Sequence, residues 1–299
     1  MRRQLAAASE LPPSRVTIRG NDDPKTQGKR VLMPLRPATA TSEFSPWTRL
    51  RGAVRRWTGP AWEFLFPPAC VVCGGEVPGD RPALCAACRS QFDVSNGPKC
   101  LRCAARVGPH LDTSQGCLRC RDETFAFRRV LAWGVYDGLL RQTMLRGKSA
   151  RGRPVILLLA DLFLADLLPD LLTEPFDAVV PVPHDWRRRV WQLQAPSETF
   201  AERIASRLQR RYTPHILRKP RATPRQATAP PSVRRRQQRG AFVVPPGLDL
   251  TGARLLLVDD VLTTGATAHA AAQALRAAGA ADIVVAVLVR GLGHRARPA

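Results

Sequence analysis

The chain is poor in aromatic and acidic residues for its length. Aromatics make up 6% of its 299 residues, and 24 acids stand against 46 Lys or Arg, which gives a net charge of +22 at pH 7. No stretch has the 18 or more apolar residues of a membrane span, because the most apolar one, 156–172, carries three aspartates at helical spacing. This composition argues against a transmembrane helix and is typical of a globular protein. The positive charge indicates either phosphate-rich ligands or nucleic acid, or a solvated surface rich in arginine.

Several common signatures are missing. There is no GxxxxGK[ST] phosphate loop, no GxGxxG fingerprint and no Ser/His/Asp arrangement, and the histidines at 110, 215, 269 and 294 lack the spacing of a metal site. Near the N-terminus, Arg2 and Arg3 precede only a short apolar run, 5–8. That run is too short for the apolar segment of a signal peptide. We therefore expect a cytoplasmic protein.

The composition changes along the chain and predicts five segments. Residues 1–55 are rich in proline and polar residues, which predicts a disordered extension. A short amphipathic linker helix is expected at 56–69, within a stretch of Trp and Arg that either packs on the neighbouring domain or contacts a membrane surface or nucleic acid. A cysteine-rich module (70–121), a larger α/β domain (125–292) and a tail (293–299) follow.

All eight cysteines fall into C-x-x-C pairs. The pairs are Cys70/Cys73, Cys85/Cys88, Cys100/Cys103 and Cys117/Cys120. Each pair can present two thiolates to one ion, and four thiolates complete the tetrahedron that Zn²⁺ prefers. The pattern therefore predicts two structural Cys₄ zinc sites. Sequential grouping of the pairs is the simplest, and cross-bracing is the alternative; disulfides and iron–sulfur ligation are less favoured.

The larger domain alternates apolar strands with helices. Strands are predicted at 129–136, 177–183, 255–260 and 283–290, and helices at 154–172, 197–211 and 264–278, the last closed by a glycine at 279. Continuous apolar strands separated by helices favour a parallel sheet covered on both faces. The fold class is thus α/β, preceded by a small zinc-ribbon module.

The segment 255–267, LLLVDDVLTTGAT, has the features of a sugar-phosphate site. Two acids, Asp259 and Asp260, end a buried strand, and a loop of small and hydroxyl residues then leads into a helix. The start of a helix offers free amides and a partial positive charge to a phosphate. The acids are suited to the vicinal hydroxyls of a ribose. The segment predicts a ribose 5-phosphate site; the alternative is an ordinary turn capped by threonines.

This segment resembles the phosphoribosyl diphosphate (PRPP) motif of type I phosphoribosyltransferases. Other motifs narrow the resemblance: the four cysteine pairs, Lys148 in LRGKSARGR, AVVPVP at 178–183, Thr223 with Gln226, and RGAF at 239–242. Together they are similar to the ComF family, which includes competence proteins. The resemblance implies a type I phosphoribosyltransferase-like sheet and a PRPP ligand bound with Mg²⁺.

By this resemblance, two sets of residues form the site. The PRPP-binding set is Asp259, Asp260, Thr263, Thr264, Gly265, Ala266 and Thr267. The diphosphate loop and the mobile flap, 218–239, would supply Val182, Pro183, His184, Arg187, Arg221, Thr223 and Gln226. From 185 to 239 there are 15 Arg or Lys against three acids, which suits a diphosphate pocket.

The sequence departs from the family at 192–196. Family members usually carry RGFNQ there, and this chain has QLQAP. Ligand binding is therefore predicted, whereas the acceptor and turnover stay open. Two functions follow: a PRPP-binding phosphoribosyltransferase-type accessory factor in DNA uptake or nucleotide-linked metabolism, or a non-catalytic protein that binds single-stranded nucleic acid. Single-stranded DNA and DNA-uptake proteins are the expected partners beside PRPP.

Overall fold

A computed structural model describes residues 69–77, 84–94, 97–183, 195–220 and 240–291. These residues belong to two compact units. One unit contains 69–77 and 84–92, and the other contains the rest. The predicted extension 1–55, the tail 293–299 and all of the predicted helix 56–69 except Ala69 lie outside the described residues.

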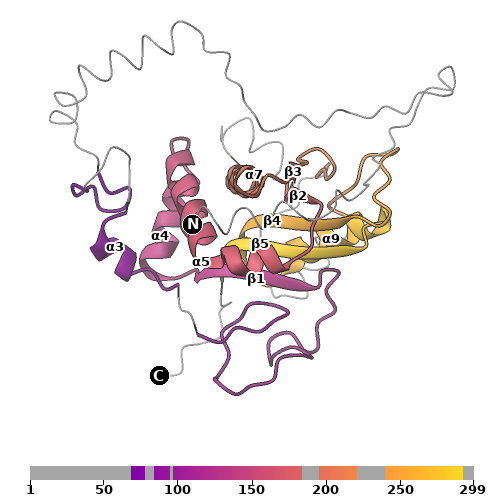
Figure 1. Cartoon of the computed structure of the whole chain (residues 1–299), viewed down its shortest axis with the longest axis horizontal. Coiled ribbons are helices and arrows are strands. Elements are labelled where there is room, and N and C mark those ends of the chain that lie inside the picture. Colours follow the sequence, from indigo (N-terminus) through magenta and orange to yellow (C-terminus); the bar gives the residue numbers. More distant parts are fainter. Residues whose placement is uncertain (1–68, 78–83, 95–96, 184–194, 221–239, 292–299) are drawn as a thin grey trace, which may run out of the picture. The chain divides into compact units, whose positions relative to one another are not determined.

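A five-stranded parallel sheet forms the centre of the larger unit (Figure 1). The strand order is β1-β5-β4-β2-β3, and every neighbouring pair is parallel. The strands are β1 (Arg129–Val135), β2 (Ala178–Pro181), β3 (Arg211–Tyr212), β4 (Arg254–Leu262) and β5 (Asp282–Arg290). Because β4 and β5 lie in the middle of the sheet and are covered on both faces, their sequences are almost continuously apolar.

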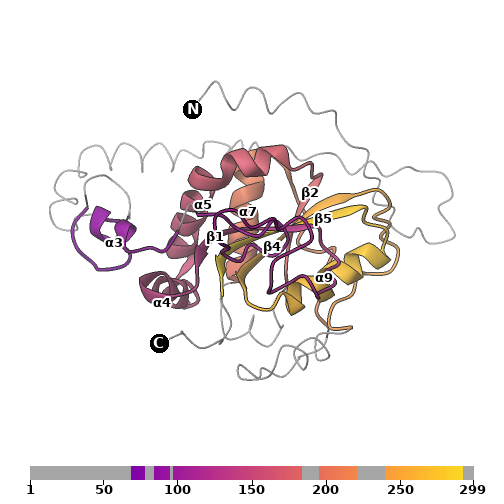
Figure 2. The same ribbon diagram turned by 90° about the horizontal axis from the view of Figure 1, so that it is seen from below.

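Helices cover both faces of this sheet. Figure 2 shows α5 (Arg153–Thr173) and α7 (Pro196–Leu208) on one side and α9 (Ala266–Ala277) on the other. Alternate residues of β4 serve the two layers, since side chains of a strand point to opposite faces in turn. Leu255 and Leu257 belong to the core cluster that includes Leu275 of α9. A further helix, α4 (Gly138–Gly147), connects β1 to α5.

The structure confirms the predicted α/β class and corrects some elements. The four long strands appear within a few residues of their predicted bounds. The predicted helix 197–211 is wrong at its end: α7 stops at Leu208, where Gln209 adopts a left-handed conformation with φ of 50°, and β3 follows. Two short helices were not predicted, α4 and α3 (Ala86–Ser90).

The order of the strands defines where a ligand would approach. From β2 the chain passes through α7 to the edge strand β3, whereas from β4 it passes through α9 to β5 on the opposite side. The connections therefore diverge at the carboxyl ends of β2 and β4. Such a point of divergence is where open α/β sheets bind ligands.

In the part of the chain that the structure describes, none of the helices combines the length and the apolar character that a membrane span requires.

Candidate functional site

The turn between β4 and α9 lies at this point of divergence. We call residues 262–267 the β4–α9 turn. It follows the two acids near the end of β4, Asp259 and Asp260, which are both buried. Gly265 has a φ of +80°, a conformation that favours glycine, and it occupies the N-cap position of α9 without a side chain to cap the helix. The turn therefore presents the start of a helix beside two carboxyl groups.

A lysine from a distant segment forms an ion pair with one of the two acids. Nζ of Lys148, the residue after α4, lies 2.6 Å from Oδ2 of Asp260. The Asp260 amide donates a hydrogen bond of 2.9 Å to Oδ1 of Asp259. One cation thus faces two adjacent buried acids, and the Lys148 side chain keeps some exposure to solvent.

These surroundings disfavour the charged form of Asp259. Burial and the neighbouring Asp260 carboxylate raise the pKa of Asp259 well above its usual value, although Lys148 acts in the opposite direction. A protonated carboxyl can donate a hydrogen bond as well as accept one. The pair can therefore offer both donors and acceptors to the hydroxyl groups of a sugar.

The hydroxyl residues of the turn differ in exposure. Thr263 is exposed, and Thr264 and Thr267 are half-buried. Oγ1 of Thr264 accepts a hydrogen bond of 3.3 Å from the amide of Ala266. The predicted PRPP-binding residues therefore lie in β4 and the turn that follows it, where Thr263 is exposed and the two acids before it are buried.

The segment after β2 adjoins this turn. The Val182 amide donates to the Val258 carbonyl at 2.8 Å, and Oγ of buried Ser197 donates to the Val182 carbonyl at 2.9 Å. Val182 is buried and Pro183 half-buried, and the hydrogen bond to Val258 places Val182 beside β4. The other predicted loop and flap residues lie outside the described residues: His184, Arg187, Arg221, Thr223 and Gln226.

Two residues near the turn have roles that sequence reasoning missed. Arg290, the last residue of β5, donates hydrogen bonds to the carbonyls of Leu262 (3.0 Å) and Thr263. Phe125 lies behind Gly265, because a Cβ added to this glycine would come within 3.2 Å of the Phe125 ring. For Phe125 the signal was an aromatic residue soon after the last cysteine pair, followed by Phe127 two positions later. A strand-terminal arginine carries no signal of its own.

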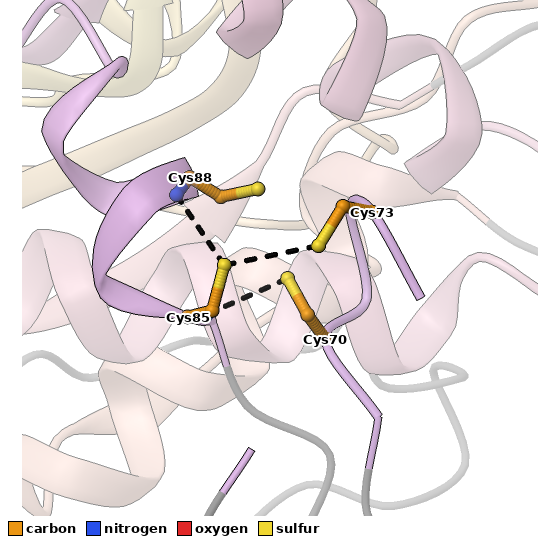
Figure 3. Close-up of side chains that lie close together, drawn as sticks. All are labelled: Cys70, Cys73, Cys85 and Cys88. Atoms are coloured by element: carbon orange, nitrogen blue, oxygen red, sulfur yellow. Dashed lines mark hydrogen bonds between the residues drawn. The ribbon is translucent and has the colours of Figure 1, made fainter. Parts of the chain in front are cut away.

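The cysteines form two sequential groups of four. In the smaller unit, Cys70, Cys73, Cys85 and Cys88 bring their sulfurs within 4.8 Å of one another (Figure 3). In the larger unit, the other four cysteines do the same: Cys100, Cys103, Cys117 and Cys120. The simplest predicted grouping is therefore confirmed, and the cross-braced alternative is wrong.

The sulfur separations fit zinc and not disulfides. A tetrahedral ion with Zn–S bonds of about 2.3 Å places its sulfurs about 3.8 Å apart, whereas a disulfide requires about 2.05 Å. The measured distances are 3.8 Å for Cys73–Cys85, 3.6 Å for Cys100–Cys120 and 3.7 Å for Cys103–Cys117. Backbone amides also donate to the sulfurs, as from Cys85 to Cys70 at 3.5 Å. Both groups can hold Zn²⁺ in a closed structural site.

The thiols of each group resist simultaneous ionisation when no cation is present. Burial by itself would raise the pKa of the Cys70 thiol. Hydrogen bonds from backbone amides together outweigh this effect and lower the pKa to about 6. Burial and the neighbouring thiols raise the pKa of Cys88 to about 12. In the second group the pKa of Cys100 falls to about 7 and that of Cys103 rises to about 11. A divalent cation removes this conflict because it stabilises all four thiolates together.

Two family models match the chain. The model described as a double zinc ribbon domain matches residues 61–122, and the model described as a phosphoribosyl transferase domain matches residues 194–298. The first contains both cysteine groups, and the second contains the β4–α9 turn.

Curated relatives share most of this length. "DNA utilization protein YhgH" from Salmonella typhimurium is 28% identical over 226 residues, which cover 71% of this chain and 98% of the relative. The protein of the same name from Escherichia coli O157:H7 has the same identity and coverage.

Solved structures show a weaker likeness. A Leishmania donovani UMP synthase is 19% identical with a TM-score of 0.28, over 46% of this chain and 22% of that one. Glutamine PRPP amidotransferase from Bacillus subtilis, complexed with ADP and GMP, is 21% identical with a TM-score of 0.33. The match covers 48% of this chain and 30% of the amidotransferase chain.

The sulfur geometry predicts two zinc ions per chain, each held by one sequential group. A variant in which Cys70, Cys73, Cys85 and Cys88 are all serine should keep one zinc ion. The reason is that the other group lies wholly in the larger unit. Elemental analysis of purified protein measures the ratio. A ratio of zero in this variant would contradict sequential grouping.

The raised pKa of Asp259 predicts a gain in stability for Asp259→Asn at neutral pH. Because the folded pKa lies above the unfolded value, the native state loses stability as pH rises from about 4 through the folded pKa. The asparagine avoids this loss and keeps the acceptor for the Asp260 amide. Urea unfolding should show the variant more stable than the parent chain at pH 7.5, with the difference shrinking at pH 4.5.

The variant and the parent chain are compared at the same pH. The contribution of cysteine protonation to the free energy of unfolding is then the same in both proteins and cancels in their difference. The matched control is Asp282→Asn, since Oδ2 of Asp282 accepts a 3.0 Å hydrogen bond from Arg128 and gains nothing by losing its charge. An Asp259→Asn variant less stable than the parent at pH 7.5 would show that the buried acid is favourably ionised.

Proposed function

We propose that this chain, a double zinc ribbon and phosphoribosyltransferase-domain protein of the ComF type, binds PRPP at the β4–α9 turn. The observation that carries the proposal is the position of Asp259 and Asp260 in β4, shortly before the start of α9, whose N-cap residue Gly265 has no side chain. The 5-phosphate would lie on the amides and hydroxyls of 263–267, and the ribose hydroxyls on the two carboxyl groups. This arrangement separates the anionic and the hydroxyl ends of one ligand.

The charges of the site suit such a ligand. An acid facing a phosphate dianion would repel it, but these acids lie within β4, before the helix start that would receive the phosphate. Lys148 already pairs with Asp260 at 2.6 Å and would offset the negative charge of the acids. When bound with the ligand, Mg²⁺ would supply neutralisation of the diphosphate charge.

The reaction class that such a site serves is transfer of a ribosyl 5-phosphate group with loss of diphosphate. The buried carboxyl groups would face the sugar on which positive charge develops as the diphosphate leaves. His184 and Arg187, which follow β2 in the sequence, belong to this proposal as diphosphate contacts, as do Arg221, Thr223 and Gln226 of the predicted flap.

A role in DNA handling is supported by a different observation. The relatives that cover 71% of the chain are named for DNA utilization, and 185–239 carries 15 Arg or Lys against three acids. We propose that the protein acts in the cytoplasm as an accessory factor in DNA uptake or use, with single-stranded DNA as a partner. Contacts to phosphates would make this binding depend steeply on salt.

Calorimetric titration with PRPP and Mg²⁺ tests the ligand. We expect the parent chain to bind and Asp260→Asn to bind at least about tenfold more weakly, because a hydrogen bond to a charged group is lost. Asp282→Asn is the matched control and should bind within about twofold of the parent. It changes the same residue type at the start of β5, the opposite end of the sheet.

Each outcome of this titration decides between the functions. Unchanged binding by Asp260→Asn would remove the acids from the site. Absence of PRPP binding, together with binding of single-stranded DNA that weakens steeply with salt, would favour the non-catalytic nucleic-acid protein.

A further inference from the structure

Arg290 joins the second cysteine group to the β4–α9 turn. Its side chain is buried, and Nε donates to the Cys103 carbonyl at 2.9 Å. The same guanidinium donates to the carbonyls of Leu262 at 3.0 Å, Gly291 at 2.6 Å and Thr263. One side chain therefore fixes the backbone of a predicted zinc ligand and the backbone of the turn in the same hydrogen-bond network.

The charge of this arginine has an unusual environment. Its hydrogen bonds to Leu262, Thr263 and Gly291 go to backbone carbonyls, which carry no full charge, although a buried cation normally needs an opposite charge. The side chain of Cys103, a predicted zinc ligand, also interacts with the guanidinium. Four thiolates around Zn²⁺ carry a net charge of −2. The loaded cysteine group next to Arg290 would supply the missing negative charge, so the metal stabilises the arginine in its present position.

A second connection reaches the same turn through aromatic packing. Arg102, inside the Cys100–Cys103 pair, donates to the carbonyls of Gln115 and Glu123 and lies 5.9 Å from the centre of the Phe125 ring. Phe125 stacks on Phe127 at 4.6 Å and covers Gly265 from behind. The amide after Phe125, that of Ala126, donates to Nδ1 of His269 on α9 at 3.0 Å. The residues that follow the second cysteine group therefore contact the turn at Gly265 and α9 at His269.

We propose that Arg290 is a positioning residue through which the second zinc ribbon, Cys100–Cys120, holds the β4–α9 turn in its ligand-binding conformation. The proposal concerns the second group, which lies in the same compact unit as the turn. The consequence for PRPP rests on the function proposed above, whereas the consequence for the turn itself does not.

Hydrogen exchange without ligand tests the coupling directly. The probes are the Gly291 amide, which donates to the Leu262 carbonyl at 2.7 Å, and the His269 amide, which donates to the Gly265 carbonyl at 2.8 Å. In Arg290→Met both should exchange at least about tenfold faster, while amides in the middle of β4 and β5 keep their protection. Unchanged exchange at both probes would overturn the proposal.

Matched cysteine variants separate the two metal sites. Cys117→Ser should accelerate exchange at the same two amides, because it removes a ligand of the second group without touching the Cys103 carbonyl. Cys73→Ser, which removes a ligand of the first group, should leave both amides unchanged. Equal acceleration by the two variants would also overturn the proposal.

A conservative variant guards against simple unfolding. Arg290→Lys keeps the positive charge but loses the planar fork that reaches several carbonyls at once. We expect intermediate exchange at the turn with normal protection of the sheet, and PRPP binding weakened in the order parent, Arg290→Lys, Arg290→Met. If Arg290→Met does not fold, Arg290→Lys decides: unchanged exchange at the two probes would contradict the role.

Hydrogen exchange tests the coupling, and PRPP binding tests the proposed function, so each proposal can be contradicted without the other. If the parent chain does not bind PRPP but the exchange results hold, the coupling stands and the proposed function fails. If the parent chain binds PRPP and exchange at the turn ignores Arg290 and Cys117, the coupling fails and the proposed function stands.

Discussion

The turn between β4 and α9 is held between a buried cation behind it and two buried acids before it. Arg290 binds the carbonyls of Leu262 and Thr263, while Asp259 and Asp260 precede them in the same strand. Neither charge could be buried alone, because desolvation of an isolated ion is costly. Lys148 offsets the acids, and the second cysteine group lies next to the arginine. The site therefore depends on four separate segments of the chain: β4 with its turn, the segment of Lys148, the end of β5 and the second cysteine group.

Topology explains why these segments meet. In a parallel sheet the carboxyl ends of all strands lie at one edge. β4 delivers the acids to that edge, β5 delivers Arg290 beside Leu262, and β2 delivers Val182 beside Val258. The second ribbon enters at the same edge through the Cys103 carbonyl. The second cysteine group and the α/β sheet of the same unit are thereby connected at the turn.

Much of the fold could be predicted from local patterns. The buried strands are continuous apolar runs, and the spacing of the cysteines predicts two groups of four. The Asp-Asp and TTGAT residues marked the turn because strand, loop and helix start follow each other directly in sequence. The matches to the double zinc ribbon and phosphoribosyl transferase domain models are both local in this sense, since each covers one continuous segment.

Most of the missed features depend on contacts between distant residues. Lys148 and Asp260 are 112 positions apart, and a lysine after a glycine looks like an exposed turn residue. Arg290 ends an apolar strand, where a charged residue usually marks the return to solvent, yet it contacts Cys103 at a separation of 187 residues. The end of α7 was overestimated because Gln209 adopts φ of 50°, a conformation that its residue type does not signal.

A crystal structure of the protein with ribose 5-phosphate would test whether the β4–α9 turn is the sugar-phosphate site. We expect a phosphate within hydrogen-bond distance of the amides of Gly265, Ala266 and Thr267, with the ribose hydroxyls on Asp259 and Asp260. A phosphate bound elsewhere, or a turn whose carboxyl groups keep their contacts with Lys148 and exclude the sugar, would contradict it.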